Sequence, residues 1–463
     1  MRPAQRIAAA LAFVTAALAA PSAQVPGWLD TYGEPVARLI EAATSSDTAW
    51  ERLAELTDTF GHRLSGSQAL ADAIEWAMTR MRADGFDVVR ADPVKVPHWI
   101  RGRESLEIVA PRQHRIPMLG LGMSVGTPPG GIEAELLVVG SFAELDRRGD
   151  EARGRIVLFD VPYNGYSQTV AYRTNGAVHA ARYGAVAVLV RSIGPQGLRT
   201  PHTGMLSYRR DVPQIPAAAI PVEDSKRLAR MAARGDRLRL RLQMEARLAP
   251  EADSANVIAE VRGRERPDEI VVLGCHFDSW DVGTGASDDA GGCVAVWEAA
   301  RLMLALDLRP RRTVRVVLFT NEENGLRGGL DYRRRYADEL ARHVLMVESD
   351  LGVAAPTGFG FTGSDTARDQ VRAIASLLSA IDAVNVGPSG GGADIGPSVS
   401  AGRIPAMSPE VDSSAYFRIH HTDADTIEQI DPRALARHVA ALSAMAYVVA
   451  DMPTRLGEVP GTR

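Results

Sequence analysis

Acidic and imidazole side chains gather in short segments of the second half of the chain, at positions where a hydrolase with two metal ions would need them. The segments are GCHFDSWD (274–281), GASDDAGG (285–292), TNEENG (320–325), VESD (347–350) and HHTDADT (420–426). Each follows an apolar, strand-like run or lies in a Gly-rich turn. All could therefore meet at one edge of a sheet, where α/β enzymes place their active sites.

The residue types within these segments suggest separate roles. His276 and Asp278 end a strand with one residue between them, so their side chains point to the same side. The imidazole is a good zinc ligand, and the carboxylate can orient or polarise it. Asp288 lies in a Gly-rich turn that lets the backbone approach closely, so its two oxygens could bridge two ions.

The glutamate pair Glu322 and Glu323 is costly to ionise unless positive charge lies nearby. A metal resolves this if one glutamate binds it while the other takes a proton from bound water. Asp350 offers a further oxygen ligand, and His421 offers a second imidazole.

We therefore expect two metal sites that share one carboxylate. His276 and Asp350 would bind one ion, Glu323 and His421 the other, and Asp288 and a water would bridge them. Nitrogen and oxygen donors without thiolate favour Zn²⁺, with Co²⁺ or Mn²⁺ as possible substitutes.

A purely structural interpretation exists for each of these residues, since a lone histidine is often a satisfied polar group and paired glutamates often face solvent. Their joint position at strand ends of one predicted domain favours a site. For His420 we expect packing or a substrate-facing role instead.

Strand and helix patterns predict an α/β fold with a mainly parallel, mixed sheet flanked by helices. Residues 24–107 read as the N-terminal part of the catalytic domain, with two helices around a loop, and residues 251–455 as its main part. Residues 108–250 contain short β-branched runs and no metal-ligand cluster, which indicates a separate β-rich insert.

Composition excludes some functions and partners. The chain has 463 residues and a net charge of −5, so nothing is basic enough to indicate nucleic-acid binding. Residues 1–23 resemble an export signal, with Arg2 and Arg6 before an apolar stretch that is shorter than the ~20 residues of a membrane span. We expect a secreted or periplasmic mature protein without a membrane anchor.

The chain has two cysteines, Cys275 and Cys293, so no disulfide framework holds the fold together. They could pair in an oxidising compartment or act as small buried hydrophobes, and the second interpretation is favoured.

The motifs together resemble those of co-catalytic zinc exopeptidases of the aminopeptidase type. The likeness runs from GHRLSGS (61–67) through TPHTG (200–204) to AYVVADM (446–452) and includes YFRIHHTDADT (416–426). The resemblance implies that Glu322 is the general base and acid, that Asp278 supports His276, and that two zinc ions are bound. It implies these metal ligands: His276, Asp288, Glu323, Asp350 and His421, the last chosen over His420 because it directly precedes Thr422.

The resemblance also implies a peptide substrate, a homodimer and a protease-associated domain as the insert. Cys275 stands where the family often has glycine, and Asn321 stands where alanine is common. Neither departure removes a ligand.

The function favoured by the sequence is that of a metal-dependent exopeptidase acting on dipeptides or short peptides. Polar groups around GGADIG (391–396), including Asp394, and Tyr416 would hold the substrate's terminus. Whether the amino or the carboxyl end is bound stays open. The alternative is a glutaminyl-cyclase-like transferase or a non-catalytic peptide-binding relative, although such a cyclase usually binds a single zinc.

Overall fold

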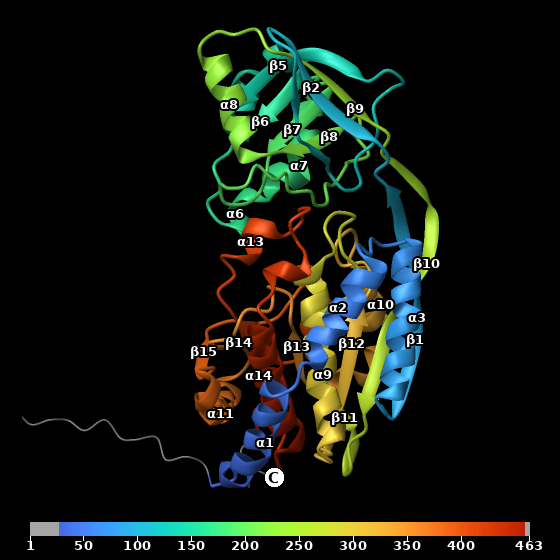
Figure 1. The fold of residues 1–463 in the computed structure, drawn as a ribbon, viewed down its shortest axis with the longest axis vertical. Coiled ribbons are helices and arrows are strands. Elements are labelled where there is room, and N and C mark those ends of the chain that lie inside the picture. Colours follow the sequence, from blue (N-terminus) through green and yellow to red (C-terminus); the bar gives the residue numbers. More distant parts are fainter. Residues whose placement is uncertain (1–26, 459–463) are drawn as a thin grey trace, which may run out of the picture.

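The computed structural model describes residues 27–458, which form two eight-stranded sheets (Figure 1). In spatial order, the strands of the first sheet are β1 (Val88–Ile100), β10 (Arg247–Val261), β12 (Arg312–Phe319), β11 (Arg266–His276), β13 (His343–Glu348), β16 (Ala406–Glu410), β14 (Gly358–Thr362) and β15 (Asn385–Gly387). Those of the second sheet are β3 (His114–Ile116), β2 (Glu104–Ala110), β9 (Arg239–Met244), β5 (Ile132–Val139), β6 (Ile156–Phe159), β7 (Ala187–Arg191), β8 (Ala217–Ile220) and β4 (Leu119–Gly120).

Helices cover both faces of the first sheet. One face is covered by α1 (Gly33–Thr44), α2 (Thr48–Phe60), α3 (Gln68–Ala83), α9 (Gly291–Ala305), α11 (Asp365–Ala375) and α14 (Pro432–Asp451), and the other by α10 (Arg327–Arg335) and α12 (Gly396–Gly402). The short helix α13 (Tyr416–Ile419) lies near the second sheet (Figure 1). Single helical turns occur at Leu29–Tyr32, Ala286–Ala290, Ala337–Arg342, Ser376–Ile381 and Ile427–Gln429.

The central strands are continuous apolar runs because both of their faces are buried. In β11, Val271 and Leu273 pack against α9 and α14, while Ile270 and Val272 pack on the opposite face with Tyr332 of α10. Successive side chains of a strand point to opposite faces, so such a strand needs apolar residues at every position. β11 is parallel to both β12 and β13, and these three strands therefore end at the same edge of the sheet.

The second sheet and its helices form a module of residues 104–244, which we call the second-sheet module. Its helices are α4 (Phe142–Arg147), α5 (Gly149–Ala152), α6 (Tyr166–Thr169), α7 (Ala171–Ala181) and α8 (Val222–Ala233). β1 and β10 pair antiparallel along their length, from Val88 opposite Glu260 to Ile100 opposite Arg247. The chain enters the module after β1 and returns through β10 (Figure 1).

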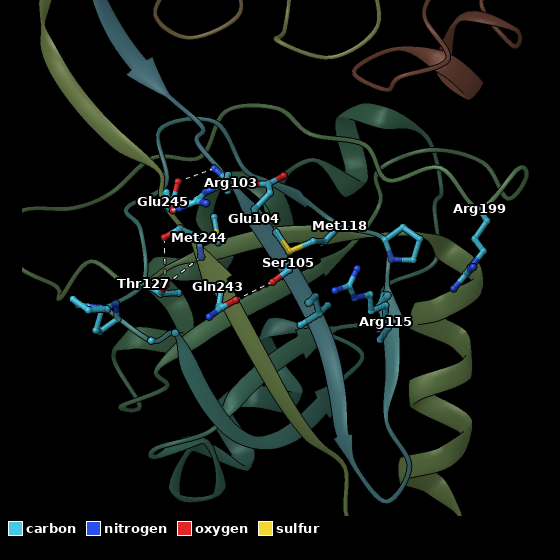
Figure 2. Close-up of a pocket in the computed structure, with 17 residues that line it drawn as sticks. Arg103, Glu104, Ser105, Arg115, Met118, Thr127, Arg199, Gln243, Met244 and Glu245 are labelled. Atoms are coloured by element: carbon cyan, nitrogen blue, oxygen red, sulfur yellow. Dashed lines mark hydrogen bonds and ion pairs between the residues drawn. The ribbon is translucent and has the colours of Figure 1, made fainter.

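A hollow of about 1090 Å³ lies on the second-sheet module, beside β2 and β9 (Figure 2). Arg103, Arg115 and Glu245 are among its lining residues. None of the predicted metal-binding or catalytic residues lines it.

The expected α/β class, with a mixed sheet flanked by helices, is confirmed. The prediction of two helices before residue 85 was wrong, because three are present. α1 ends at Thr44, and the hydroxyl of Ser46 accepts a hydrogen bond from the backbone N–H of Thr48 at the start of α2. Serine hydroxyls often satisfy the free amides at a helix start, and this local signal marks the break.

The export signal predicted for residues 1–23 lies outside the described residues. Among residues 27–458, no helix combines the length and the apolar character needed to cross a bilayer.

Candidate active site

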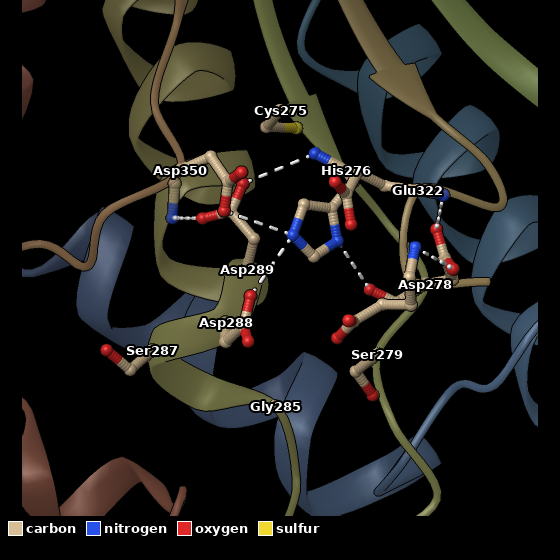
Figure 3. Close-up of polar contacts among 12 residues, drawn as sticks. Cys275, His276, Asp278, Ser279, Gly285, Ser287, Asp288, Asp289, Glu322 and Asp350 are labelled. Carbon is tan, nitrogen blue, oxygen red and sulfur yellow. Dashed lines mark hydrogen bonds and ion pairs between the residues drawn. The ribbon is translucent and has the colours of Figure 1, made fainter. Parts of the chain in front are cut away.

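Predicted site residues, among them His276, Asp288, Glu322 and Asp350, come together at the edge where β11, β12 and β13 end (Figure 3). His276 is the last residue of β11, and Asp350 follows β13 by two residues. Glu322 and Glu323 follow β12, which ends at Phe319. This is the edge at which open α/β sheets bind their ligands.

A first group of possible metal ligands joins His276, Asp288 and Asp350. Nε2 of His276 lies 3.1 Å from Oδ1 of Asp288 and 3.2 Å from Oδ1 of Asp350. One ring nitrogen thus faces two carboxylates, an arrangement that a shared cation would satisfy.

A second group joins Asp288, Glu323 and His421. Nε2 of His421 lies 3.3 Å from Oδ2 of Asp288 and 3.1 Å from Oε2 of Glu323. Asp288 therefore directs one oxygen at each group. Oε1 of Glu323 is buried without a hydrogen-bond partner among the described residues. The donor set of both groups, imidazole nitrogens and carboxylate oxygens, fits zinc.

Burial and mutual charge set the protonation of these groups. Burial, followed by the nearby Asp288, raises the pKa of Glu323 to about 7. Burial also raises the pKa of Glu322 well above its ordinary value, helped by Asp350 and Glu323. Burial acts to lower the pKa of His276, but Asp350 and Asp288 overcome it and raise that pKa. Such crowding of buried acids favours a bound cation.

The main chain of Asp278 contacts His276, whereas its carboxylate contacts the turn that carries the glutamates. Nδ1 of His276 lies 2.9 Å from the backbone oxygen of Asp278, so the main chain and not the carboxylate orients the ring. The carboxylate of Asp278 accepts hydrogen bonds from the backbone N–H groups of Glu322 (3.0 Å) and Glu323 (3.4 Å) and from Ser65 Oγ (3.1 Å). Asp278 therefore holds the turn that carries both glutamates.

Two buried residues that the sequence did not single out brace the turn around Asp288. Arg63 donates hydrogen bonds to the backbone oxygens of Phe277, Thr284 and Gly285. The carboxylate of Asp425 accepts the backbone N–H groups of Ser287 and Asp288 at 2.7 and 3.1 Å. Both lie in quoted motifs, GHRLSGS and HHTDADT, but side chains that hold a distant backbone leave no local pattern.

Cys275 and Cys293 form a disulfide, with their Cα atoms 5.1 Å apart. The favoured expectation of two unpaired, buried cysteines was therefore wrong. The bond joins the end of β11 to the first turn of α9, since Cys275 precedes His276 and Cys293 follows the Asp288 turn. This proximity arises from the turn between β11 and α9, which the spacing of the cysteines does not reveal.

The residues suggested for substrate binding flank the metal-binding groups without bonding to them. Asp394 is fully buried, and neither of its carboxylate oxygens has a hydrogen-bond partner among the described residues. Tyr416 is buried, and its ring lies 5.2 Å from that of His420. A hollow of about 150 Å³ beside Asp350 is lined in part by Gly391 and Gly392 of the GGADIG loop.

Comparison with known proteins identifies the family. The profile described as Peptidase family M28 matches residues 256–446, which contain every predicted metal ligand. Carboxypeptidase Q of Mus musculus is 45% identical over 408 residues, which are 88% of this chain and 87% of the mouse protein. The chain belongs to peptidase family M28.

Solved structures support the same assignment for this M28 peptidase. A peptidase M28 precursor from Shewanella amazonensis superposes with a TM-score of 0.90 at 35% identity, covering 93% of this chain and 99% of that one. A zinc aminopeptidase from Bacillus subtilis superposes with a TM-score of 0.67 at 20% identity, covering 87% and 94%, and shows the fold alone.

The resemblance inferred from the motifs is confirmed, and so is the expectation of a metal-dependent exopeptidase. Membership in a peptidase family does not favour the transferase or non-catalytic alternatives.

Proposed function

We propose that this M28 peptidase hydrolyses dipeptides or short peptides at a centre of two zinc ions. His276, Asp288 and Asp350 would hold one ion, and Asp288, Glu323 and His421 the other. The observation that carries the proposal is that the two ligand groups share Asp288, with one oxygen of its carboxylate facing each histidine. Two bound ions would lower the pKa of a water between them and stabilise the developing oxyanion.

Glu322 is the general base and acid of this proposal. It lies next to the ligand Glu323 on the turn that Asp278 holds, and its carboxylate has no hydrogen-bond or ion-pair partner among residues 27–458. The carboxylate takes a proton from the attacking water and gives it to the amine that leaves when the peptide bond breaks. Burial and the neighbouring carboxylates favour the protonated form of Glu322, which suits the transfer of the proton to the leaving amine.

The Glu322→Gln variant tests this role. Glutamine keeps the shape of the side chain but cannot take up a proton, so we expect kcat to fall by about 10²–10⁴-fold while zinc stays bound. Glu428→Gln is the matched control, because Glu428 is exposed. Hydrolysis of a dipeptide and metal content are measured for both variants. Near-normal turnover by Glu322→Gln would show that the base is misassigned.

We propose that the free end of the substrate lies in the hollow beside Asp350, near Gly391, Gly392 and Asp394 of the GGADIG loop and near Tyr416. Three residues of this hollow, Glu348, Asp350 and His438, are ionisable. Asp350 belongs to the proposed first metal site, and the Glu348 carboxylate accepts the backbone N–H groups of Asp394 and Ile395, so neither carboxylate is free to select the substrate's ammonium group. We therefore place the free end of the substrate here without assigning it to the amino or the carboxyl end.

Capped dipeptides test which end is bound. With the amine as the recognised group, N-acetyl dipeptides resist cleavage and C-amidated dipeptides are cut. The uncapped dipeptide serves as the control for each cap. Resistance of the C-amides alone would assign recognition to the carboxyl end, and resistance to neither cap would contradict binding of a free end in this hollow.

On the family resemblance we also propose that the second-sheet module is a protease-associated domain inserted into the catalytic domain, and that the enzyme forms a homodimer. Export after removal of residues 1–23 is part of the same proposal. Co²⁺ or Mn²⁺ could replace zinc, because both accept the same nitrogen and oxygen donors.

A further inference from the structure

The TPHTG segment of the second-sheet module contacts the metal-binding residue His421 directly. The backbone N–H of Thr203 donates to the backbone oxygen of His421 at 2.9 Å. The backbone oxygen of Thr203 lies 3.3 Å from Nδ1 of the same histidine. Two main-chain groups of one residue in the module thus face both the backbone and the ring of a metal ligand that is 218 positions away.

Arg173 of α7 lies at the same contact. Its guanidinium Nη1 is 3.4 Å from the Thr203 oxygen and 3.3 Å from Nδ1 of His421, and Nη2 donates to the hydroxyl of Tyr166 at 2.7 Å. Arg173 is only 6% exposed, and it forms no ion pair within residues 27–458. Burying an unpaired guanidinium costs free energy, so this position calls for an explanation.

Which ring nitrogen of His421 carries the proton determines which of these contacts can be hydrogen bonds. Nε2 of His421 faces Asp288 and Glu323, so a neutral ring that binds through Nε2 carries its proton on Nδ1. Nδ1 of His421 and Nη1 of Arg173 are then both donors and cannot bond to each other. The backbone oxygen of Thr203 can accept from both, since a carbonyl has two lone pairs.

The residues around Arg173 leave room for its guanidinium beside Thr203 and His421. Gly204 has a φ of +130°, and a Cβ atom there would lie 2.3 Å from Nη1 of Arg173, so the glycine admits the guanidinium. The Tyr166 ring stacks on Phe417 with centroids 5.5 Å apart and meets His420 edge-on at 5.2 Å. These contacts seat α6 against α13, the helix that leads into His421 (Figure 1).

We propose that Arg173 is a positioning residue for the second metal site. Arg173 holds the Thr203 carbonyl in place, and this carbonyl orients the His421 ring so that Nε2 faces Asp288 and Glu323. The second-sheet module is then part of the metal centre through this contact. This inference rests on the proposed two-zinc function.

Zinc retention by full-length variants tests the inference. Arg173→Met, Arg173→Lys and Arg191→Met are equilibrated with zinc and a graded series of chelator, and bound zinc is counted per chain. Arg191 is a matched control because it is 7% exposed in the same module but pairs with Asp160 at 3.4 Å, and it is not among the hydrogen-bond or ion-pair partners of His421. His421→Ala shows the loss expected when the second site is removed.

We expect Arg173→Met to bind one of its two ions about 10–100-fold more weakly, the usual effect of removing a group that orients a metal ligand. Arg173→Lys should lie between Arg173→Met and the wild type, because lysine keeps a cationic donor. Arg191→Met should retain zinc as the wild type does. Thermal unfolding of each variant separates loss of zinc from loss of the fold. If Arg173→Met does not fold, the zinc retention of Arg173→Lys is compared with that of the wild type instead.

Equal zinc retention by Arg173→Met and the wild type would overturn the inference, as would an equal loss in Arg191→Met. A wild-type protein that binds fewer than two zinc ions would instead contradict the proposed function. The two failures are therefore distinguishable.

Discussion

Asp278 supports the site through backbone groups and without occupying a metal position. Its buried carboxylate accepts the amide N–H groups of both Glu322 and Glu323, and so fixes the proposed base and a proposed metal ligand relative to each other. A carboxylate that accepts two backbone N–H groups restrains a turn more firmly than a neutral side chain does. The position of Glu322, the proposed general base, thus depends on a residue at the end of another strand.

The Asp278→Asn variant separates this role from the expected support of His276. The amide keeps the size of the side chain but loses one acceptor oxygen, so the glutamate turn loosens. We expect kcat to fall about 10–100-fold, with the His276 ion retained. Ser65→Ala removes a hydroxyl that donates to Asp278 and accepts from Asn321 but leaves the Asp278 carboxylate in place, and it should have a smaller effect. The kcat and the zinc content of each variant are measured together. If Asp278→Asn loses the His276 ion while the molecules that keep zinc have a normal kcat, the carboxylate supports His276 and not the glutamate turn.

For individual residues, the sequence predicted which side chains come together, because those residues follow strand-like runs or lie in Gly-rich turns. The resemblance to zinc exopeptidases favoured His421 over His420, and Nε2 of the His421 ring lies 3.3 Å from Asp288 and 3.1 Å from Glu323. The roles of Arg63 and Asp425 could not be predicted. Both act on backbone groups, and Arg63 reaches more than 200 positions along the chain.

At the scale of elements, β13 is tied to α10 through His343, the first residue of the strand. Nδ1 of His343 donates to the backbone oxygen of Glu339, and Nε2 accepts from the hydroxyl of Tyr332 at 2.8 Å. This pattern requires a neutral ring. Burial, with minor repulsion from Arg315, lowers the pKa of His343 to about 4.

The neutral His343 predicts a pH-dependent stability. The pKa of His343 is about 6.5 in the unfolded chain and about 4 in the folded chain. The stabilisation that the neutral ring contributes is therefore complete above pH ~6.5, and it is lost as the pH falls from ~6.5 to ~4. Between pH 7.5 and 5.5 the wild type should lose about 1 kcal/mol more of its free energy of unfolding than His343→Gln does. Denaturant unfolding at both pH values measures this, and equal losses would show that His343 does not titrate as described.

The elements themselves were predicted unevenly. The buried strands β11, β12 and β13 and the helices α9 and α14 follow from continuous apolar runs and helical periodicity. The division of the N-terminal region into α1 and α2 depends on the three residues after Thr44, which an apolar pattern does not mark. The disulfide depends on a turn whose conformation the spacing of Cys275 and Cys293 does not determine.

At the scale of the whole molecule, two sheets joined by β1 and β10 meet beside the candidate active site (Figure 1). The first sheet supplies the strand ends that carry His276, Glu323 and Asp350, and the second-sheet module supplies contacts to His421. The alternation of strands and helices could predict the first sheet. It could not predict that the module reaches the site, since contacts between distant segments arise only when both have folded.

In the proposed mechanism, Asp288 bridges two zinc ions. A crystal of the zinc-loaded protein, measured at the zinc absorption edge, shows the position of each ion directly. We expect two anomalous peaks about 3.5–4 Å apart, with Asp288 between them, one beside His276 and Asp350 and the other beside Glu323 and His421. A single peak, or two peaks that Asp288 does not join, would contradict it.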